Sequence, residues 1–245
     1  DATIQRLEQF IFTEDVRVGS LAESLSGVWL HGPRAASVLE QVIDGARGLN
    51  DWPEYRHSQF EFGDSPVSVV RISQLGVPGF CVYVERAREE SLVAALSGAG
   101  AAIVSDDAIT AARIEVGYPV FGIDMTDDTI PLEAGIESRP ISFTKGCYVG
   151  QEVIIRVLHR GHGRVVRKLV SLRINGQRPQ SGATLYAGER EAGVVTSAGE
   201  SPRLGTIALG YAHRDFITAG TELEVAMPSG RVRAIVTEIP VASAV

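Results

Sequence analysis

The chain has 245 residues, of which 44% are hydrophobic and 22% are charged. These values are typical of a folded protein with a sizeable core, and the length favours two or three domains over one. The net charge of −7 argues against a general nucleic-acid-binding surface, and no apolar run approaches the roughly 20 residues of a membrane span.

The two cysteines, Cys81 and Cys147, are too few for a disulfide framework. We favour two free thiols of an intracellular, cytoplasmic protein over the alternative, a Cys81–Cys147 disulfide. The first residues, Asp1–Arg6, lack the basic segment followed by an apolar segment that marks a signal peptide. The sequence therefore predicts no membrane partner and no signal peptide.

Residues 1–116 mix helix and strand patterns. Apolar residues at helical spacing and suitable first-turn residues predict helices at Ile4–Ile11, Pro33–Ile43 and Arg86–Leu96. A further helix is predicted after residues 105–106, where the side chain of either Ser105 or Asp106 can cap it. Runs of β-branched and aromatic residues predict strands at Val16–Gly19, Val28–His31, Phe60–Phe62, Pro66–Ile72, Phe80–Val84 and Ala101–Val104. The mixture over residues 28–116 predicts an antiparallel sheet with helices on one face.

Residues 117–163 are irregular at first and then helical. The segment Gly117–Thr144 contains three prolines, and long irregular segments of compact proteins are often functional. A helix is predicted from Gly150 to about Leu158, with Glu152 in the first turn, where the helix dipole favours an acidic side chain. Gly161 and Gly163 are expected to end this helix.

After Arg164 the pattern changes to short strands separated by glycine and proline turns. The predicted strands are Val165–Ile174, Ala183–Tyr186, Gly193–Thr196, Gly205–Tyr211, Thr221–Ala226 and Arg231–Ile239. Such spacing is typical of a small all-β barrel or sandwich. We therefore predict a domain boundary near Gly163.

The segment Lys145–Glu152 reads Lys-Gly-Cys-Tyr-Val-Gly-Gln-Glu. Its thiol, Cys147, lies in a loop with glycines on both sides, just before a predicted helix. The helix dipole and Lys145 both favour the thiolate, and Gly146 and Gly150 allow backbone geometries that bring amides close to a ligand. From the residue types alone, a reactive thiol and an inert buried cysteine are equally well supported.

This segment resembles the signature of the YgfZ/GcvT-like folate-binding family, which includes YgfZ-type proteins and the T-protein of the glycine cleavage system. Seven of its eight positions are fixed in that signature. Further segments are also similar to the family, so the resemblance covers nearly the whole chain. These segments are Arg113–Pro119 (Arg-x-Glu-x-Gly-x-Pro), Ile130–Gly135, Gly193–Ser197, Ser201-Pro202 and Ile207–Tyr211.

The resemblance implies an α+β, GcvT-like folate-binding fold. Residues 1–27 and 117–163 would form part of the folate-binding domain, residues 28–116 a ferredoxin-like α+β domain, and residues 164–245 a C-terminal β-barrel. Family members carry a further N-terminal portion before the segment that begins at Leu7, and it includes the acidic residue to which T-protein catalysis is ascribed. We expect that portion to be absent here.

The resemblance also implies tetrahydrofolate as the cofactor. Cys147 is the candidate catalytic residue. The candidate folate-binding residues are Arg113, Glu115, Lys145, Gly146, Tyr148, Gly150, Gln151 and Glu152. The planar fork of arginine suits the carboxylates of a folate glutamyl tail, although without the motif we would favour a salt bridge for Arg113. T-proteins have a pterin-contacting glutamate at the position aligned with Cys81, and this departure argues against aminomethyl transfer.

No metal site is predicted. His159 and His162 lie at a helix end without an acidic or thiol partner in the sequence, so we favour charge complementarity with the helix dipole. A local basic run is either a solvated face or a site for a polyglutamate tail or an acidic partner. It consists of Arg156, Arg160, Arg164, Arg167 and Lys168.

Three functions are compatible with these features. The YgfZ resemblance favours a tetrahydrofolate-binding accessory protein that supports iron–sulfur cluster assembly or repair, with Cys147 as the key thiol and iron–sulfur enzymes or assembly proteins as partners. The alternative is a folate-dependent aminomethyltransferase of the T-protein type, so enzymatic activity is left open. The third is a scaffold that does not bind folate, because a fold does not fix a function.

Overall fold

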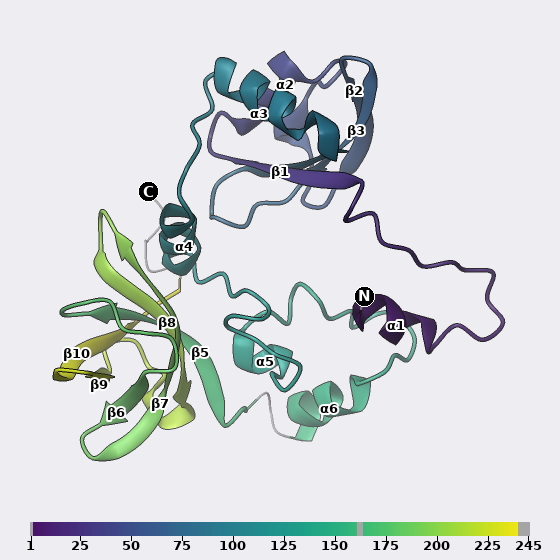
Figure 1. Cartoon of the computed structure of the whole chain (residues 1–245). Coiled ribbons are helices and arrows are strands. Elements are labelled where there is room, and N and C mark those ends of the chain that lie inside the picture. Colours follow the sequence, from purple (N-terminus) through teal and green to yellow (C-terminus); the bar gives the residue numbers. More distant parts are fainter. Residues whose placement is uncertain (1, 161–163, 240–245) are drawn as a thin grey trace. The chain divides into compact units, whose positions relative to one another are not determined.

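The computed structural model describes residues 2–160 and 164–239 (Figure 1). The chain divides into two compact units, Asp1–Ile103 and Val104–Val245, and each unit has its own hydrophobic core. The division into three domains stays a prediction, and its boundary near Gly163 lies outside the described residues, as do Gly161 and His162. Among the described residues, no helix is long and apolar enough to cross a membrane.

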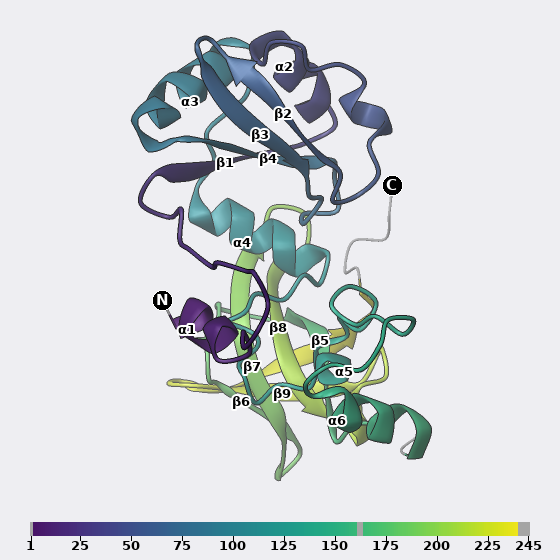
Figure 2. The same ribbon diagram turned by 90° about the vertical axis from the view of Figure 1, so that its right-hand side faces the viewer.

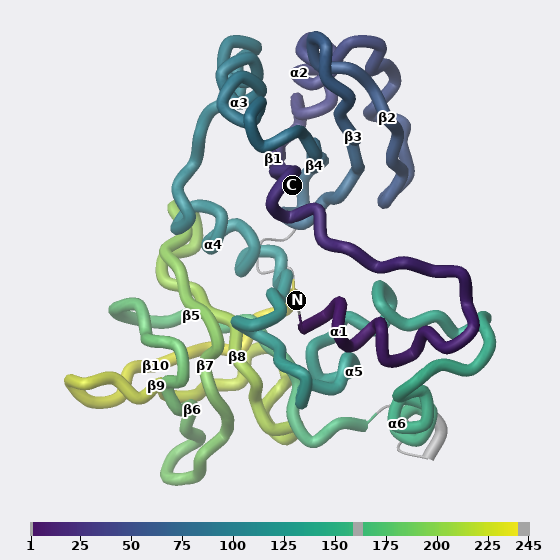
Figure 3. The backbone as a smooth tube through the Cα atoms, turned by 45° about the vertical axis from the view of Figure 1, so that its right-hand side comes forward, coloured from purple at the N-terminus to yellow at the C-terminus, as the bar shows by residue number. Residues whose placement is uncertain are grey.

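The first unit is built around a four-stranded antiparallel sheet with the strand order β1-β4-β3-β2. Its strands are β1 (Leu25–His31), β2 (His57–Phe62), β3 (Ser65–Arg71) and β4 (Gly79–Glu85). Its helices are α1 (Ala2–Glu8), α2 (Ala35–Val42) and α3 (Glu89–Gly98), with short 3₁₀ turns at Leu49–Asp51 and Arg86–Arg88. Figure 3 shows the long irregular segment, residues 9–24, that joins α1 to β1.

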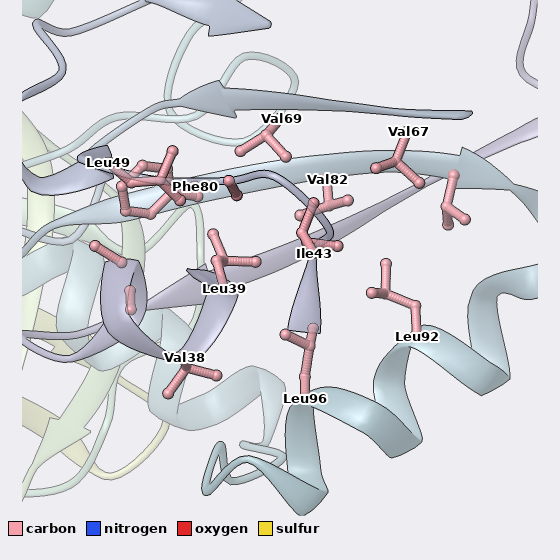
Figure 4. Close-up of a cluster of buried hydrophobic side chains, with 14 of the residues drawn as sticks. Val38, Leu39, Ile43, Leu49, Val67, Val69, Phe80, Val82, Leu92 and Leu96 are labelled. Atoms are coloured by element: carbon pink, nitrogen blue, oxygen red, sulfur yellow. The ribbon is translucent and has the colours of Figure 1, made fainter. Parts of the chain in front are cut away.

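One face of this sheet is covered by α2 and α3. Leu39 of α2 and Leu92 of α3 are fully buried against Val82 and Phe80 of the central strand β4 (Figure 4). Alternate residues of β2 and β3 point into the same core, because successive side chains of a strand face opposite sides of the sheet. The predicted antiparallel sheet with helices on one face is therefore confirmed.

Two predicted strands are not formed. Val16–Gly19 and Ala101–Val104 have no strand partner. The side chains of Val16, Ile103 and Val104 are exposed. A β-branched sequence favours an extended backbone, but a strand also needs a neighbour that accepts its hydrogen bonds and covers its side chains. The helix predicted from Arg86 begins as a 3₁₀ turn and becomes α-helical only at Glu89.

The second unit ends in a closed six-stranded antiparallel barrel, as the strand spacing predicted. The strands are β5 (Arg167–Ile174), β6 (Thr184–Ala187), β7 (Arg190–Ser201), β8 (Gly205–His213), β9 (Glu222–Met227) and β10 (Gly230–Thr237). They follow the order β10-β5-β8-β7-β6-β9, and pairing of β10 with β9 closes the barrel. Side chains such as Leu172, Leu185 and Val225 fill its interior and are fully buried.

Helix α4 (Asp106–Glu115) packs on the outside of this barrel, across β7 and β8 (Figure 2). Ser105 caps it as predicted, because its hydroxyl oxygen accepts from the amide of Ala108 at 3.3 Å. Ile114 forms a small core with Leu209 and Tyr211 of β8. Between α4 and the barrel, the chain forms the short helices α5 (Pro131–Ala134) and α6 (Gln151–Ile155), and α6 continues into a π-helical turn at Arg156–Arg160.

Candidate functional site

A buried ion pair joins α4 to the irregular segment that follows it. Arg113 is only 6% exposed, and its Nη1 donates to Asp124 Oδ2 at 2.7 Å. The same nitrogen lies 3.4 Å from the carbonyl oxygen of Tyr118. The side chain of Asp124 is fully buried, so the two charges neutralise each other away from solvent.

The carboxylate of Asp124 also accepts hydrogen bonds from two other segments of the chain. Its Oδ2 accepts from the backbone amide of Val120 at 3.0 Å. Its Oδ1 accepts from the hydroxyls of Thr196 and Ser197 on β7, at 2.5 and 2.6 Å. Asp124 therefore connects α4, the loop at residues 118–125 and the barrel, all within the second unit.

One edge of the Arg113 guanidinium remains available. Among the described residues, Nε and Nη2 have no hydrogen-bond partner, and neither belongs to the atoms that are both fully buried and unpaired. This edge of the guanidinium is therefore unpaired within the described part of the chain. Its parallel N–H groups match the two oxygens of a carboxylate, which fits the predicted role of Arg113 towards a folate.

Glu115 already has partners. Its Oε2 accepts from Arg203 Nη2 and its Oε1 from the hydroxyl of Ser201, both at 2.6 Å. The carboxylate thus links the end of α4 to the end of β7. In this arrangement Glu115 serves the packing of α4 on the barrel, and its role towards a folate stays a prediction.

A second polar cluster lies on the outer face of β5 and β8. Arg167 Nε donates to Glu133 Oε2 of α5 at 3.1 Å, and its guanidinium lies 4.8 Å from the centre of the Tyr211 ring. The Tyr211 hydroxyl is buried without a well-formed hydrogen bond. Burial raises the pKa of Tyr211 to about 12, against the opposing effect of the Arg167 charge.

The predicted thiol lies on the surface. Cys147 is free and exposed, in a loop that ends at α6. Lys145 Nζ lies 4.8 Å from the centre of the Tyr148 ring, a cation–π distance. The inert, buried cysteine that the residue types also allowed is therefore excluded for Cys147.

The two glycines of the signature have different conformations. Gly150 has φ +88, in the left-handed region, and immediately precedes α6. Gly146 does not have a positive φ, and a Cβ atom there would meet nothing within 4 Å. A side chain would resist the backbone conformation of Gly150, whereas the approach of the Gly146 and Gly150 amides to a ligand stays a prediction.

The remaining signature residues organise the start of α6. Gln151 Oε1 lies 3.4 Å from the backbone amide of Tyr148, and the amide of Gln151 donates to the carbonyl of Tyr148. Glu152 forms an exposed ion pair with Arg156 at 2.6 Å, one helical turn later. None of these residues contacts Arg113 or Glu115 in a described hydrogen bond or ion pair. The predicted site is therefore two separate groups in the second unit, one at α4 and one at α6 (Figures 1 and 2).

Two members of the basic run are engaged in ion pairs. Arg156 pairs with Glu152, while Arg167 pairs with Glu133 and lies on Tyr211. Among the described residues, no group of three or more histidine, cysteine or acidic side chains could hold a metal ion. His162 and the side chain of His159 lie outside the described part of the chain.

Cys81 lies on the face of the first unit's sheet that α2 and α3 leave uncovered. It pairs with Trp29 of β1, and a Cβ atom at Gly27 would lie 3.2 Å from its sulfur. Burial raises the pKa of the Cys81 thiol to about 11. Trp29 is 44% exposed, whereas Trp52 is buried in the core.

Sequence reasoning missed Asp124. A buried carboxylate with four donors is a prominent feature of this site, but a lone aspartate in an irregular segment has no pattern of its own. The only sequence feature that pointed to this region was the irregular pattern of Gly117–Thr144, which follows the motif residue Arg113.

Two family models match the chain. The model described as the GCVT N-terminal domain matches residues 1–145, and the model described as the glycine cleavage T-protein C-terminal barrel domain matches residues 167–241. The second match covers all six strands of the barrel.

Similar proteins carry the name aminomethyltransferase. One from Thermosynechococcus vestitus is 32% identical over 213 residues, which are 86% of this chain and 57% of the relative. One from Rubrobacter xylanophilus is 32% identical over 200 residues, 81% of this chain and 52% of the relative. This chain thus spans little more than half the length of these relatives.

A solved structure shows the same fold. The crystal structure of glycine cleavage system aminomethyltransferase T from Bartonella henselae has a TM-score of 0.80 and 25% sequence identity. The match covers 98% of this chain and 65% of that chain. The GcvT-like α+β fold with a C-terminal barrel is therefore confirmed.

Proposed function

Because this chain belongs to the glycine cleavage T-protein family, we propose that the protein containing it binds tetrahydrofolate and transfers an aminomethyl group to it. The observation that carries this proposal is the agreement of the two family models, which span most of the chain, with relatives named aminomethyltransferase at 32% identity. This reverses the order of the sequence-based expectations, in which support of iron–sulfur clusters came first.

The residues at α4 fit a folate. Tetrahydrofolate carries carboxylates at its glutamyl end, and the Nε–Nη2 edge of Arg113 offers two parallel donors that are unpaired among the described residues. Because the guanidinium is held by a buried carboxylate, little side-chain entropy remains to be lost on binding. Arg113 would thus bind and orient the ligand, while the aminomethyl chemistry itself belongs to the bound folate and the donor.

Calorimetry of the full-length protein with tetrahydrofolate tests the binding, and a purified assay with an aminomethyl donor tests the transfer. We expect micromolar binding that Arg113→Lys weakens about tenfold, because lysine loses the bidentate geometry. The exposed variant Arg178→Lys is the control. No binding at high micromolar tetrahydrofolate would contradict the proposal and favour a scaffold that does not bind folate.

A second candidate rests on the exposed Cys147. A thiol accessible within the Lys145–Glu152 signature supports the YgfZ-type function, a folate-binding protein that assists iron–sulfur cluster assembly or repair. A single cysteine cannot hold a four-cysteine cluster alone, so any cluster contact would be shared with a partner.

The two candidates differ in what they require of Cys147. Under the second, Cys147→Ser impairs iron–sulfur enzymes in vivo, while folate binding in vitro is unchanged. Under the first, aminomethyl transfer is measurable with the purified protein and iron–sulfur enzymes keep their activity in that variant. Val149→Ser is a matched control, because Val149 is exposed in the same loop and carries no thiol.

A further inference from the structure

The Asp124 carboxylate has no capacity left for a ligand. It accepts four hydrogen bonds, from Arg113 Nη1, the Val120 amide and the hydroxyls of Thr196 and Ser197. A carboxylate has about four lone-pair sites, so all of them are used. Asp124 therefore acts on other protein groups and not on a substrate directly.

The hydrogen-bond donors to Asp124 come from two separate parts of the second unit. Thr196 and Ser197 belong to β7, which is paired with β8 over most of its length, while Val120 belongs to the loop after α4. The register of β7 shifts between Val195 and Ser197, so a β-bulge occurs where the two hydroxyls meet the carboxylate. Bulges re-aim side chains, and here two successive residues donate to one oxygen.

Stability alone does not explain this arrangement. Burying two charges costs several kcal/mol of solvation, and hydrophobic pairs of similar volume are often equally stable. A fixed guanidinium with one unpaired edge is, however, what a carboxylate-binding arginine needs, since a mobile side chain would lose more entropy on binding.

We infer that Asp124, held by Thr196 and Ser197, is a positioning residue that aims the Nε–Nη2 edge of Arg113 at a carboxylate of the folate ligand. This inference rests on the proposed folate binding. It adds a specificity: the Asp124 network matters for ligands that carry the glutamyl carboxylates and not for the pterin ring by itself.

The test compares two ligands in the full-length protein. Tetrahydrofolate carries the glutamyl carboxylates, and 6-methyltetrahydropterin does not. We expect Asp124→Asn to weaken tetrahydrofolate about tenfold or more, the scale of one charge-assisted hydrogen-bonded pair, and to change the affinity of the pterin less than about twofold. Asp107→Asn is the matched control, because it breaks an exposed ion pair on the same helix.

A double-variant cycle separates positioning from a general effect on structure. If Asp124 acts through Arg113, Asp124→Asn adds less than about twofold in an Arg113→Lys background. Should Asp124→Asn fail to fold, Ser197→Ala replaces it, because this change removes one donor to Oδ1 and leaves both charges in place. We expect the same ligand selectivity with a smaller loss.

The outcomes distinguish this inference from the proposed function. Equal losses for both ligands, or full additivity with Arg113→Lys, would overturn the positioning role while folate binding stands. Unchanged tetrahydrofolate affinity in Asp124→Asn would also overturn the positioning role and leave folate binding in place. If the wild-type protein binds neither ligand, the proposed function and this inference fall together.

Discussion

The two cysteines have opposite surroundings, although both are free. Cys147 is exposed beside Tyr148, whereas Cys81 is fully buried in β4 and its pKa is raised to about 11. Because alkylation requires an accessible thiolate, we expect iodoacetamide at pH 8 to modify Cys147 within minutes and Cys81 only in denaturant. Mass spectrometry of the digested protein measures both. Rapid labelling of Cys81 in the native protein would contradict the buried position.

Tyr211 is the residue with the clearest pH signature. Burial raises its pKa from 10.0 to about 12, so the folded state favours the neutral phenol. The stabilisation is fully present below about pH 10, where the phenol of the unfolded chain is also neutral, and is lost as the pH rises towards 12.

We expect the free energy of unfolding to fall between pH 10 and 12 more steeply in the wild-type protein than in Tyr211→Phe. The difference should reach at most about 2–3 kcal/mol, the equivalent of two pKa units. Urea unfolding at several pH values measures this difference. Cys81 is present in both proteins, so its titration contributes equally to both free energies of unfolding. Parallel curves for the two proteins would show that the hydroxyl is not buried.

At the scale of elements, the barrel was the easiest part to predict. The strands from β5 to β10 are separated by glycine or proline turns, so local sequence defines them. Val16–Gly19 and Ala101–Val104 have a similar composition but no partner strand, and pairing is a property of residues distant in sequence. Asp124 escaped prediction for the same reason, since its donors on β7 lie 72 and 73 positions further along the chain.

The start of α6 offers a test of the signature glycines. Gly150 has φ +88, and a side chain in the left-handed region costs about 1–2 kcal/mol. We therefore expect Gly150→Ala to increase hydrogen exchange of the amides of Gln151 and Arg156, which donate to the carbonyls of Tyr148 and Glu152. Gly146→Ala is the matched control, because it adds the same methyl group in open space at a backbone conformation that alanine adopts. Equal exchange in the two variants would argue against a fixed turn before α6.

At the scale of the whole molecule, the family fold could be predicted but its partition into compact units could not. The signature at Lys145–Glu152 and the barrel pattern led to the correct fold. Where compact units begin, by contrast, depends on which residues pack together. Each core cluster of the described residues draws all its members from one unit, with Leu39 in the first unit and Leu172 in the second.

Both tryptophans of the chain, Trp29 and Trp52, belong to the first unit, so tryptophan fluorescence reports the unfolding of that unit alone. We expect Leu39→Ala, which empties part of its core, to lower the fluorescence midpoint in urea by an amount equivalent to about 2–5 kcal/mol. Leu172→Ala removes the same atoms from the barrel core, and we expect it to lower the midpoint seen by far-ultraviolet circular dichroism while the fluorescence midpoint stays unchanged. Multidomain chains commonly depart from two-state unfolding in this way. A common shift of both signals in both variants would instead mean that the whole chain unfolds as one cooperative structure.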